Sequence, residues 1–264
     1  MKVYILDNGF LLMDKNILLK DAVLANADEP DRRSELIRCP IMMVLIEHER
    51  GKILFDLGCH PKAGERGYWP DRVWKSERYF HEPEQTLEAQ LALCGVTPEE
   101  IDTVVLSHLH EDHTGNAELF SHAALYAPKQ EFIDALLSVH TNPDTGYVKR
   151  EVMAPFREFH LVEGDMELYP GIEIIDLPGH TNGLLGLVIH TEKDGVLIFP
   201  QDGVFCAESY GPPARLPGGF EDSVACLASI EKVRALQKKY GAKVFFGHDP
   251  DNFPLYRHAP EYYE

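Results

Sequence analysis

Residues 107–115 read Ser-His-Leu-His-Glu-Asp-His-Thr-Gly, which places three imidazoles and two carboxylates within six positions. The segment follows the apolar run 103–106, whose β-branched residues are typical of a buried strand. The alternative is a solvated, histidine-rich turn, but chance rarely places so many ligand side chains directly behind a buried strand. The segment therefore predicts a metal site, and with it a fold that brings further ligands to this place.

The spacing within the segment indicates which side chains can converge. If the chain leaves the strand extended, His108 and His110 point to the same face, because side chains alternate along a strand. Asp112 and His113 then lie past a turn, near the start of a helix through 116–120, where they can address a second cation. Imidazole nitrogen and carboxylate oxygen suit zinc, with manganese, iron or cobalt as alternatives.

Three more candidate ligands occupy the same kind of position farther along the chain. They are His180, Asp202 and His248, and they follow the short apolar runs 172–177, 195–199 and 242–246. Such runs, bounded by Gly or Pro, predict buried strands. Ligands at the ends of strands are expected to cluster at one edge of a sheet.

These motifs resemble those of metallo-β-lactamase-fold hydrolases, whose mark is His-x-His-x-Asp-His. Here it reads His108-Leu-His110-Glu-Asp112-His113. Further matching segments are Asp-Leu-Gly at 56–58, Pro-Gly-His-Thr at 178–181, Gln-Asp-Gly at 201–203 and Gly-His-Asp at 247–249. The length, the strand ending at 45–48 and the tail at 248–253 and 260–263 are most similar to N-acyl-homoserine lactone lactonases and 4-pyridoxolactonase.

The resemblance implies an α+β fold, an αβ/βα four-layer sandwich in which two mixed β-sheets pack face to face with helices outside. It also implies a metal centre of two divalent ions. One ion would be held by His108, His110 and His180, the other by Asp112, His113 and His248, and Asp202 would bridge them. In the family, the residue that corresponds to Asp56 lies outside the ligand set. We expect Asp56 to orient a metal-bound imidazole, with stabilisation of its own loop as the alternative.

That arrangement favours hydrolysis by a hydroxide held between the metals, because metal binding brings the pKa of water to about 7. The expected reaction is the opening of a lactone ring, as in quorum quenching, with Asp112 carrying a proton to the leaving group. No serine or cysteine nucleophile is required. The five cysteines lack redox or zinc pair spacing and are interpreted as mostly buried groups, with Cys206 near Asp202.

One position departs from the family pattern. The lactonases usually carry a tyrosine three residues after the bridging aspartate, and this chain has Phe205 there. Phenylalanine keeps the ring and removes the hydroxyl that assists at the substrate. Either another group, such as Tyr210 or the metals, compensates, or the substrate is not a homoserine lactone.

Composition agrees with one hydrolase domain spanning 1–264. The chain is 44% hydrophobic and 26% charged, and no stretch reaches the roughly 18 apolar residues of a membrane helix. The beginning, 1–7, predicts a strand broken by Asp7 and Asn8 and not a signal peptide, and the odd cysteine count favours the cytoplasm. A net charge of −18 disfavours nucleic acid as a partner.

Helices are predicted at 86–93, 129–139 and 223–240. Residues 97–100 resemble the start of a helix, and Gly241 is a helix stop. The two groups of strands and helices suggest a pseudo-repeat that divides near residue 165. Two irregular segments, 60–81 and 207–220, carry aromatic residues that are expected to wall an apolar pocket for a small lactone or ester. The alternative for these aromatics is that they anchor loops or form a homodimer contact.

Other functions remain open on the same motifs. A thioesterase like glyoxalase II or a phosphodiesterase would use basic pocket groups, for which the candidates are Arg72, Arg78, Lys149, Arg150 and Arg215. A di-iron redox protein usually has Glu in place of His110, and a β-lactamase often has Cys in place of Asp202. A non-catalytic metal-binding protein is disfavoured because all seven ligand positions are filled.

Overall fold

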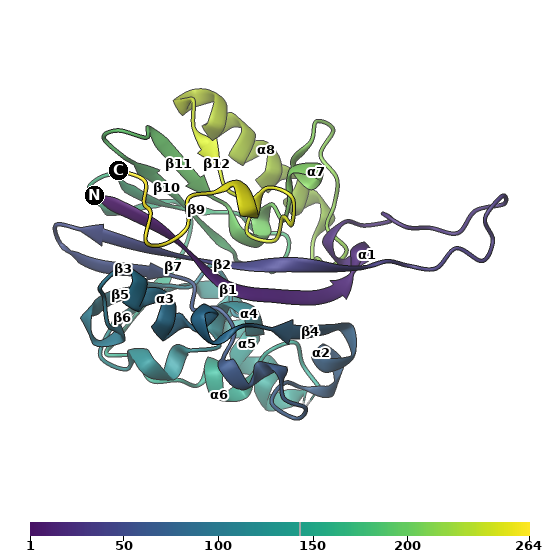
Figure 1. The fold of residues 1–264 in the computed structure, drawn as a ribbon, viewed down its shortest axis with the longest axis horizontal. Helices are drawn as coiled ribbons and strands as arrows, with labels where there is room; N and C mark the ends of the chain where they lie inside the picture. Colours follow the sequence, from purple (N-terminus) through teal and green to yellow (C-terminus); the bar gives the residue numbers. More distant parts are fainter. Residues whose placement is uncertain (143) are drawn as a thin grey trace.

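Two mixed β-sheets packed face to face form the centre of the molecule, as the computed structural model shows for residues 1–142 and 144–264 (Figure 1). The seven-stranded sheet has the order β4-β1-β2-β3-β5-β6-β7. Its strands are β1 (Lys2–Asp14), β2 (Leu36–His48), β3 (Gly51–Phe55), β4 (Glu77–Phe80), β5 (Ile101–Val105), β6 (Ala124–Pro128) and β7 (Glu158–Val162). Strands β4-β1-β2-β3 are antiparallel, whereas β3-β5-β6-β7 are parallel.

The five-stranded sheet has the order β12-β11-β10-β9-β8. Its strands are β8 (Met166–Tyr169), β9 (Ile172–Asp176), β10 (Leu185–His190), β11 (Val196–Phe199) and β12 (Lys243–Val244). Only the β11–β12 pair is parallel, so β9, β11 and β12 run in the same direction. The first sheet ends at residue 162 and the second begins at 166, which confirms the predicted division near residue 165.

Helices cover the outer faces of both sheets (Figure 1). They are α1 (Lys15–Leu18), α2 (Asp71–Ser76), α3 (Leu87–Leu93), α4 (Glu111–Thr114), α5 (Lys129–Thr141), α6 (Lys149–Val152), α7 (Ala207–Tyr210) and α8 (Ser223–Tyr240). The α8 start is capped by the Asp222 carboxylate, and Gly241 ends it with φ 62°. Helices α3 and α5 lie against the larger sheet and α8 against the smaller, so the predicted four-layer α+β sandwich is confirmed.

The alternation of side chains along the strands explains why each sheet can bury both faces. In β1, Val3 and Ile5 enter the core between the sheets, while Tyr4 and Leu6 face the helical layer. In β10, Leu187 packs between the sheets and Val188 faces α8. Because both faces are covered, the strands read as continuous apolar runs and not as alternating ones.

Two strands predicted from the sequence have other bounds in the structure, whereas one predicted helix signal is confirmed. Strand β1 does not end at Asp7 but continues to Asp14 through an irregularity between Asp7 and Phe10, where Gly9 adopts φ +83°. The start signal predicted at 97–100 is confirmed as a capping box, and it begins a 3-10 turn that leads into β5. The last predicted strand is shortened to Lys243–Val244, since the chain leaves the sheet to reach His248.

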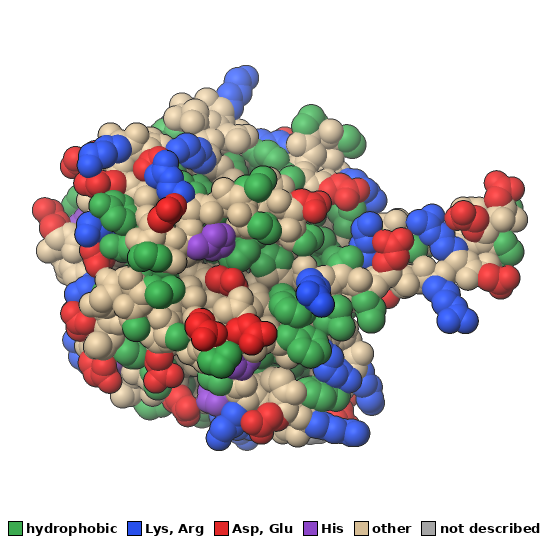
Figure 2. Space-filling model, in the orientation of Figure 1, with side chains coloured by type: hydrophobic (Ala, Val, Ile, Leu, Met, Phe, Trp, Pro, Cys, Tyr) green, Lys and Arg blue, Asp and Glu red, His purple; other side chains and the backbone are tan. Residues whose placement is uncertain are grey.

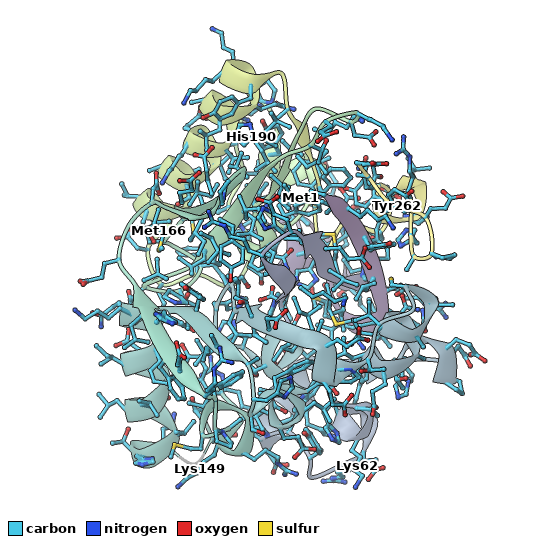
Figure 3. All side chains as sticks on the ribbon, turned by 90° about the vertical axis from the view of Figure 1, so that its left-hand side faces the viewer. Met1, Lys62, Lys149, Met166, His190 and Tyr262 are labelled. Atoms are coloured by element: carbon cyan, nitrogen blue, oxygen red, sulfur yellow. The ribbon has the colours of Figure 1, made fainter. Side chains whose placement is uncertain are left out.

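An extended arm projects from the body between α1 and β2. Residues 24–36 are exposed and carry interspersed positive and negative side chains (Figure 2). At the opposite end, the two termini lie together because Val3 pairs with Tyr263, and Figure 3 labels Met1 and Tyr262 in this region. In the described part of the chain, no helix combines the length and apolar character needed to cross a membrane.

The inter-sheet core makes a matched prediction for stability. Leu187 is fully buried between β9 and β11, whereas Leu255 is 79% exposed. We expect Leu187→Ala to lower the free energy of unfolding by about 2–5 kcal/mol, because it removes transfer energy and leaves a cavity. Leu255→Ala removes the same atoms from the surface and should change it by less than about 0.5 kcal/mol. Urea titrations measure both, and equal losses would contradict this description of the core.

Candidate metal centre

The seven candidate metal ligands predicted from the sequence lie together at one place in the fold. His108 and His110 follow β5, and Asp112 and His113 lie on the short helix α4 directly after them. From the other sheet, His180, Asp202 and His248 follow β9, β11 and β12, whose carboxyl ends lie at the same edge. Both sheets therefore contribute to one cluster, and all seven predicted positions belong to it.

Three histidines form the first half of the cluster. The Nδ1 atom of His110 lies 3.0 Å from Nε2 of His108 and 3.0 Å from Nε2 of His180. Burial lowers the pKa of His110 to about 3, and it lowers the pKa of His108 well below its usual range. These rings are therefore neutral at physiological pH, which is the state that binds a metal.

The second half of the cluster contains Asp112, His113 and His248. The Oδ2 atom of Asp112 lies 3.4 Å from Nε2 of His113 and 3.5 Å from Nε2 of His248. All three side chains are buried. Each half of the cluster thus gathers three potential ligand atoms within the span of a single ion.

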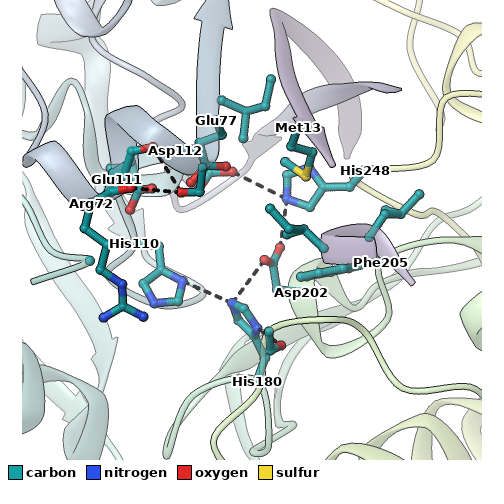
Figure 4. Close-up of a pocket in the computed structure, with 17 residues that line it drawn as sticks. Met13, Arg72, Glu77, His110, Glu111, Asp112, His180, Asp202, Phe205 and His248 are labelled. Carbon is teal, nitrogen blue, oxygen red and sulfur yellow. Dashed lines mark hydrogen bonds and ion pairs between the residues drawn. The ribbon is translucent and has the colours of Figure 1, made fainter. Parts of the chain in front are cut away.

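Asp202 lies between the halves and turns one carboxylate oxygen to each. Its Oδ2 atom is 3.3 Å from Nε2 of His180, and its Oδ1 atom is 3.1 Å from Nε2 of His248. Oδ2 also faces His108 at 3.8 Å, and Oδ1 faces His113 at 3.4 Å. This orientation is the one that a carboxylate needs to bridge two cations (Figure 4).

Two buried polar atoms support the fit of metal ions to this cluster. Nε2 of His113 and Oδ1 of Asp202 face each other, yet neither has a hydrogen-bond partner among the described residues. Buried polar atoms nearly always have a hydrogen-bond partner, so two unpaired ones that face each other indicate a position where an ion or a water molecule binds. The donor set of nitrogen and carboxylate oxygen suits divalent metals such as zinc.

The outer nitrogen of four histidines is held by an oxygen. His180 Nδ1 lies 3.0 Å from the Gly219 carbonyl oxygen, and His248 Nδ1 lies 2.8 Å from the Pro40 carbonyl oxygen. His108 Nδ1 contacts the Ser107 hydroxyl at 3.0 Å. A carbonyl can only accept, so Nδ1 of His180 and Nδ1 of His248 each carry a proton, and Nε2 is the ring atom that faces the cluster.

Asp56 contacts the fourth of these rings, that of His113, which is the position that its expected outer role requires. Its Oδ2 atom lies 2.7 Å from His113 Nδ1, and it also accepts from the Gln201 side chain. Its carboxylate accepts from both the backbone N–H and the hydroxyl of Ser107, at 2.6 and 2.8 Å. Asp56 adopts φ 60°, a left-handed conformation that Asp tolerates better than most residues.

In the absence of metal, protons take the place of cations in the second half of the cluster. Burial lowers the pKa of His113, but Asp112, Asp56 and Asp202 outweigh it and raise that pKa well above the usual range. Burial also lowers the pKa of His248, but the negative charge of Asp202 outweighs it and raises that pKa to about 9. His113 and His248 are therefore protonated at pH 7 until a cation replaces the charge.

A cavity of about 210 Å³ opens over the cluster (Figure 4). Its floor includes His110, His180, Asp202 and His248. The ring of Phe205 lies in the cavity wall, with its centroid 5.2 Å from the His180 ring and 5.4 Å from the His248 ring. The position that departs from the family pattern thus lies directly at the site.

The prediction that aromatic side chains of segments 60–81 and 207–220 form the cavity walls was wrong. Segment 60–81 reaches the cavity through Arg72, Val73, Ser76 and Glu77, and 207–220 reaches it through Gly219, so the aromatic side chains of both segments lie elsewhere. Tyr210 does not line the cavity, and its hydroxyl donates to Gln237, so it does not supply the missing hydroxyl.

Cys206, the cysteine that follows Asp202 most closely in the sequence, is not set up for chemistry at the cluster. The Cys206 thiol is buried, and burial raises its pKa, which keeps it protonated and unreactive at neutral pH.

Several supporting residues were not found from the sequence. Glu131 is buried on α5 and accepts from the Leu109 N–H at 3.1 Å, between two cluster histidines. Glu111 belongs to the motif at 107–115, but the sequence did not show that it lines the cavity. Ser107 and Gln201 stood in the quoted motifs, yet spacing alone did not show that both converge on Asp56. Such contacts depend on segments far apart in the sequence.

Comparison with known proteins agrees with this geometry. A family model described as the metallo-beta-lactamase superfamily matches residues 36–199. The chain is 32% identical to the N-acyl homoserine lactonase AiiB of Agrobacterium fabrum, over 100% of this chain and 99% of that protein. It is 27% identical to an N-acyl homoserine lactonase of Bacillus cereus, over 99% and 98%. The chain belongs to the metallo-β-lactamase superfamily.

Solved structures extend the similarity to the whole fold. An N-acyl homoserine lactone hydrolase with the product N-hexanoyl-L-homoserine at its catalytic metal centre superimposes with a TM-score of 0.84 and 26% identity, covering 99% of this chain and 98% of that one. The dizinc quorum-quenching lactonase AidC, at 20% identity, shares the fold with a TM-score of 0.71, over 94% and 87%.

Metal uptake should release protons. Because His113 and His248 carry protons in the metal-free protein, filling the centre at pH 7 is expected to release about two protons per chain. Apparent metal affinity should therefore rise with pH as these imidazoliums lose their protons, which for His248 occurs at about pH 9. Calorimetry in two buffers of different ionisation enthalpy measures the release. A binding heat that does not depend on the buffer would contradict the protonation assigned here.

Asp56→Asn tests the outer carboxylate. Asn tolerates the left-handed backbone and keeps the shape, but it removes the negative charge beside His113, so metal affinity should fall about 10–100-fold. Competition with a chelator measures the change, and circular dichroism checks that the fold is intact. Asp251→Asn, at an exposed position, is the matched control. Equal affinities for the two variants would rule out the proposed orienting role.

Proposed function

We propose that this chain is a dinuclear metal-dependent hydrolase that opens the ring of N-acyl-homoserine lactones. The single observation that carries the proposal is the placement of Asp202, whose two oxygens face two separate groups of histidines beneath one cavity. The full-length similarity to named N-acyl homoserine lactonases supports the substrate class. Quorum quenching in the cytoplasm is the role that we propose for this activity.

The metal centre is proposed to hold two zinc ions. His108, His110 and His180 would hold one, Asp112, His113 and His248 the other, and Asp202 would bind both. When bound, the ions would supply a reactive water at neutral pH and Lewis-acid polarisation of the carbonyl. No covalent attachment of the substrate to a side chain is required.

The chain's own residues orient these reactants and move the proton. Asp112 lines the cavity and lies at the cluster, so its carboxylate is placed to take a proton and pass it to the alkoxide that leaves as the ring opens. The Phe205 ring packs edge-on against the rings of His180 and His248 and so helps to hold both imidazoles in place. The carbonyls of Pro40 and Gly219 hold the imidazoles while charge develops.

The cavity favours a neutral substrate over the anionic substrates of thioesterases and phosphodiesterases. Of the five basic candidates, only Arg72 lines the cavity. Arg78 lies over the Trp74 ring and Arg150 over the Tyr68 ring. Arg215 pairs with Glu208, and Lys149 lines a separate surface cleft. A phosphodiester would meet one arginine beside two glutamates, which is poor anion recognition.

The whole chain, 1–264, is proposed to act as one hydrolase unit. The core between the sheets contains residues of β1, β2 and β3 from the N-terminal half of the chain and of β9, β10 and β11 from its C-terminal half. The cluster is built from both halves in the same way. Neither half of the chain by itself supplies all seven candidate ligands.

The test is a hydrolysis assay on three substrate classes with protein of measured metal content. We expect pH-stat assays to record ring opening of N-hexanoyl-homoserine lactone at a kcat/KM at least tenfold above that for an S-acyl glutathione or bis(p-nitrophenyl) phosphate. Asp202→Asn, which weakens the shared ligand, should abolish turnover. A wild-type protein with two metals and no lactonase activity would refute the proposed function.

Phe205→Tyr is expected to raise lactone turnover. A hydroxyl added to the ring between His180 and His248 can donate to the developing oxyanion, and a gain of about 1.4 kcal/mol in the transition state corresponds to a tenfold rise. Steady-state kcat on N-hexanoyl-homoserine lactone is the measurement. An unchanged or lower rate would show that this site does not use a hydroxyl at position 205.

A further inference from the structure

The cavity over the metal cluster has two chemically different walls. One wall is apolar and is formed by Leu11, Met13, Ile17, Leu18, Val73 and Phe205. The other is polar and contains Arg72, Ser76, Glu77 and Glu111. The apolar wall suits an alkyl chain, because burying hydrocarbon there releases water from both surfaces. The polar wall has no such use, and ring opening at the metals does not require it.

Arg72 is the group in this wall that lacks a partner. Its backbone N–H donates to the Asp144 carboxylate at 2.8 Å, which fixes the start of α2, but within the described residues its guanidinium pairs with no carboxylate and makes no hydrogen bond. Among the described residues that line the cavity, Arg72 is the only lysine or arginine. Figure 4 shows its guanidinium on the His110 side of the cavity.

The groups around Arg72 limit what it can bind. A guanidinium donates five N–H bonds and accepts none, so its partner is an acceptor oxygen. Glu77 and Glu111 line the same wall and add acceptor oxygens beside it. The wall therefore offers donors at Arg72 and acceptor oxygens at Glu77 and Glu111. It matches a neutral group that has both an acceptor oxygen and an N–H donor.

We propose that Arg72 is a specificity-determining residue that binds the carbonyl oxygen of a substrate amide, so that the enzyme prefers N-acylamino lactones to simple alkyl lactones. This inference rests on the proposed lactonase function. The amide of such a substrate is attached to the carbon next to the scissile carbonyl, so it lies within a few bonds of the metals. Arg72, which lines the cavity together with His110, is placed to meet it, and the carboxyl groups of Glu77 and Glu111 can accept its N–H.

The test compares Arg72→Ala with Lys75→Ala on metal-loaded enzyme. Lys75 is exposed on the same helix and does not line the cavity, so both variants lose one positive charge from α2. The substrates are N-hexanoyl-homoserine lactone, a γ-lactone with an alkyl chain of matched length and no amide, and an N-acyl lactone whose chain ends in a carboxylate. Thermal unfolding and metal content verify that each variant is intact.

We expect Arg72→Ala to raise KM for the N-hexanoyl lactone about tenfold, equivalent to about 1.4 kcal/mol, with kcat little changed, since a hydrogen bond to a charged donor is lost. The KM for the alkyl lactone should stay within about twofold, and Lys75→Ala should behave as wild type for both substrates. Equal losses on both lactones, no loss on either, or a loss confined to the carboxylate-bearing lactone would overturn the role of Arg72 while leaving the lactonase function intact. A wild-type enzyme that opens no lactone would overturn both.

Discussion

The carboxylate of Asp202 is the contact on which the site depends. It is buried where the ends of two sheets meet, and each of its oxygens faces a different pair of histidines. A buried cluster of carboxylates and imidazoles is costly unless opposite charge compensates it. Protons on His113 and His248 supply that charge in the metal-free chain, and two divalent cations supply it when the centre is filled.

The sandwich explains why these side chains can meet at all. Strands β9, β11 and β12 run in one direction, so the residues that follow them emerge at one edge. The loop after β5 enters that edge from the other sheet and delivers His108 through His113 within six residues. Asp56, which follows the neighbouring strand β3, fixes both Ser107 and His113 from behind. Packing between the sheets therefore determines the distances at the cluster.

Much of this could be predicted from the sequence because the responsible signals are local. The ligand motif, the short apolar runs before His180 and Asp202, and the capped helix at 223–240 each depend on neighbours in the chain. The continuation of β1 beyond Asp7 could not be predicted. Asn8 is buried there because its side chain forms hydrogen bonds with Cys59 and Gln85, and only the folded chain brings these residues together.

The cavity walls were beyond sequence reasoning for the same reason. Leu11, Met13 and Leu18 reach the cluster from the first strand and helix, about a hundred residues before the metal motif. The aromatic residues that attracted attention at 60–81 instead anchor their own segment, as Tyr68 does through its hydrogen bond to Glu151. Composition indicated an apolar cavity, but it could not indicate which segments form it.

Anomalous diffraction from crystals grown with metal, recorded on either side of the absorption edge, tests the central claim most directly. The account predicts two peaks separated by about 3.5–4 Å. One should lie among His108, His110 and His180, the other among Asp112, His113 and His248, with an oxygen of Asp202 contacting each. A single peak at full occupancy, or two peaks of which one has no contact with Asp202, would contradict a centre built on a shared carboxylate.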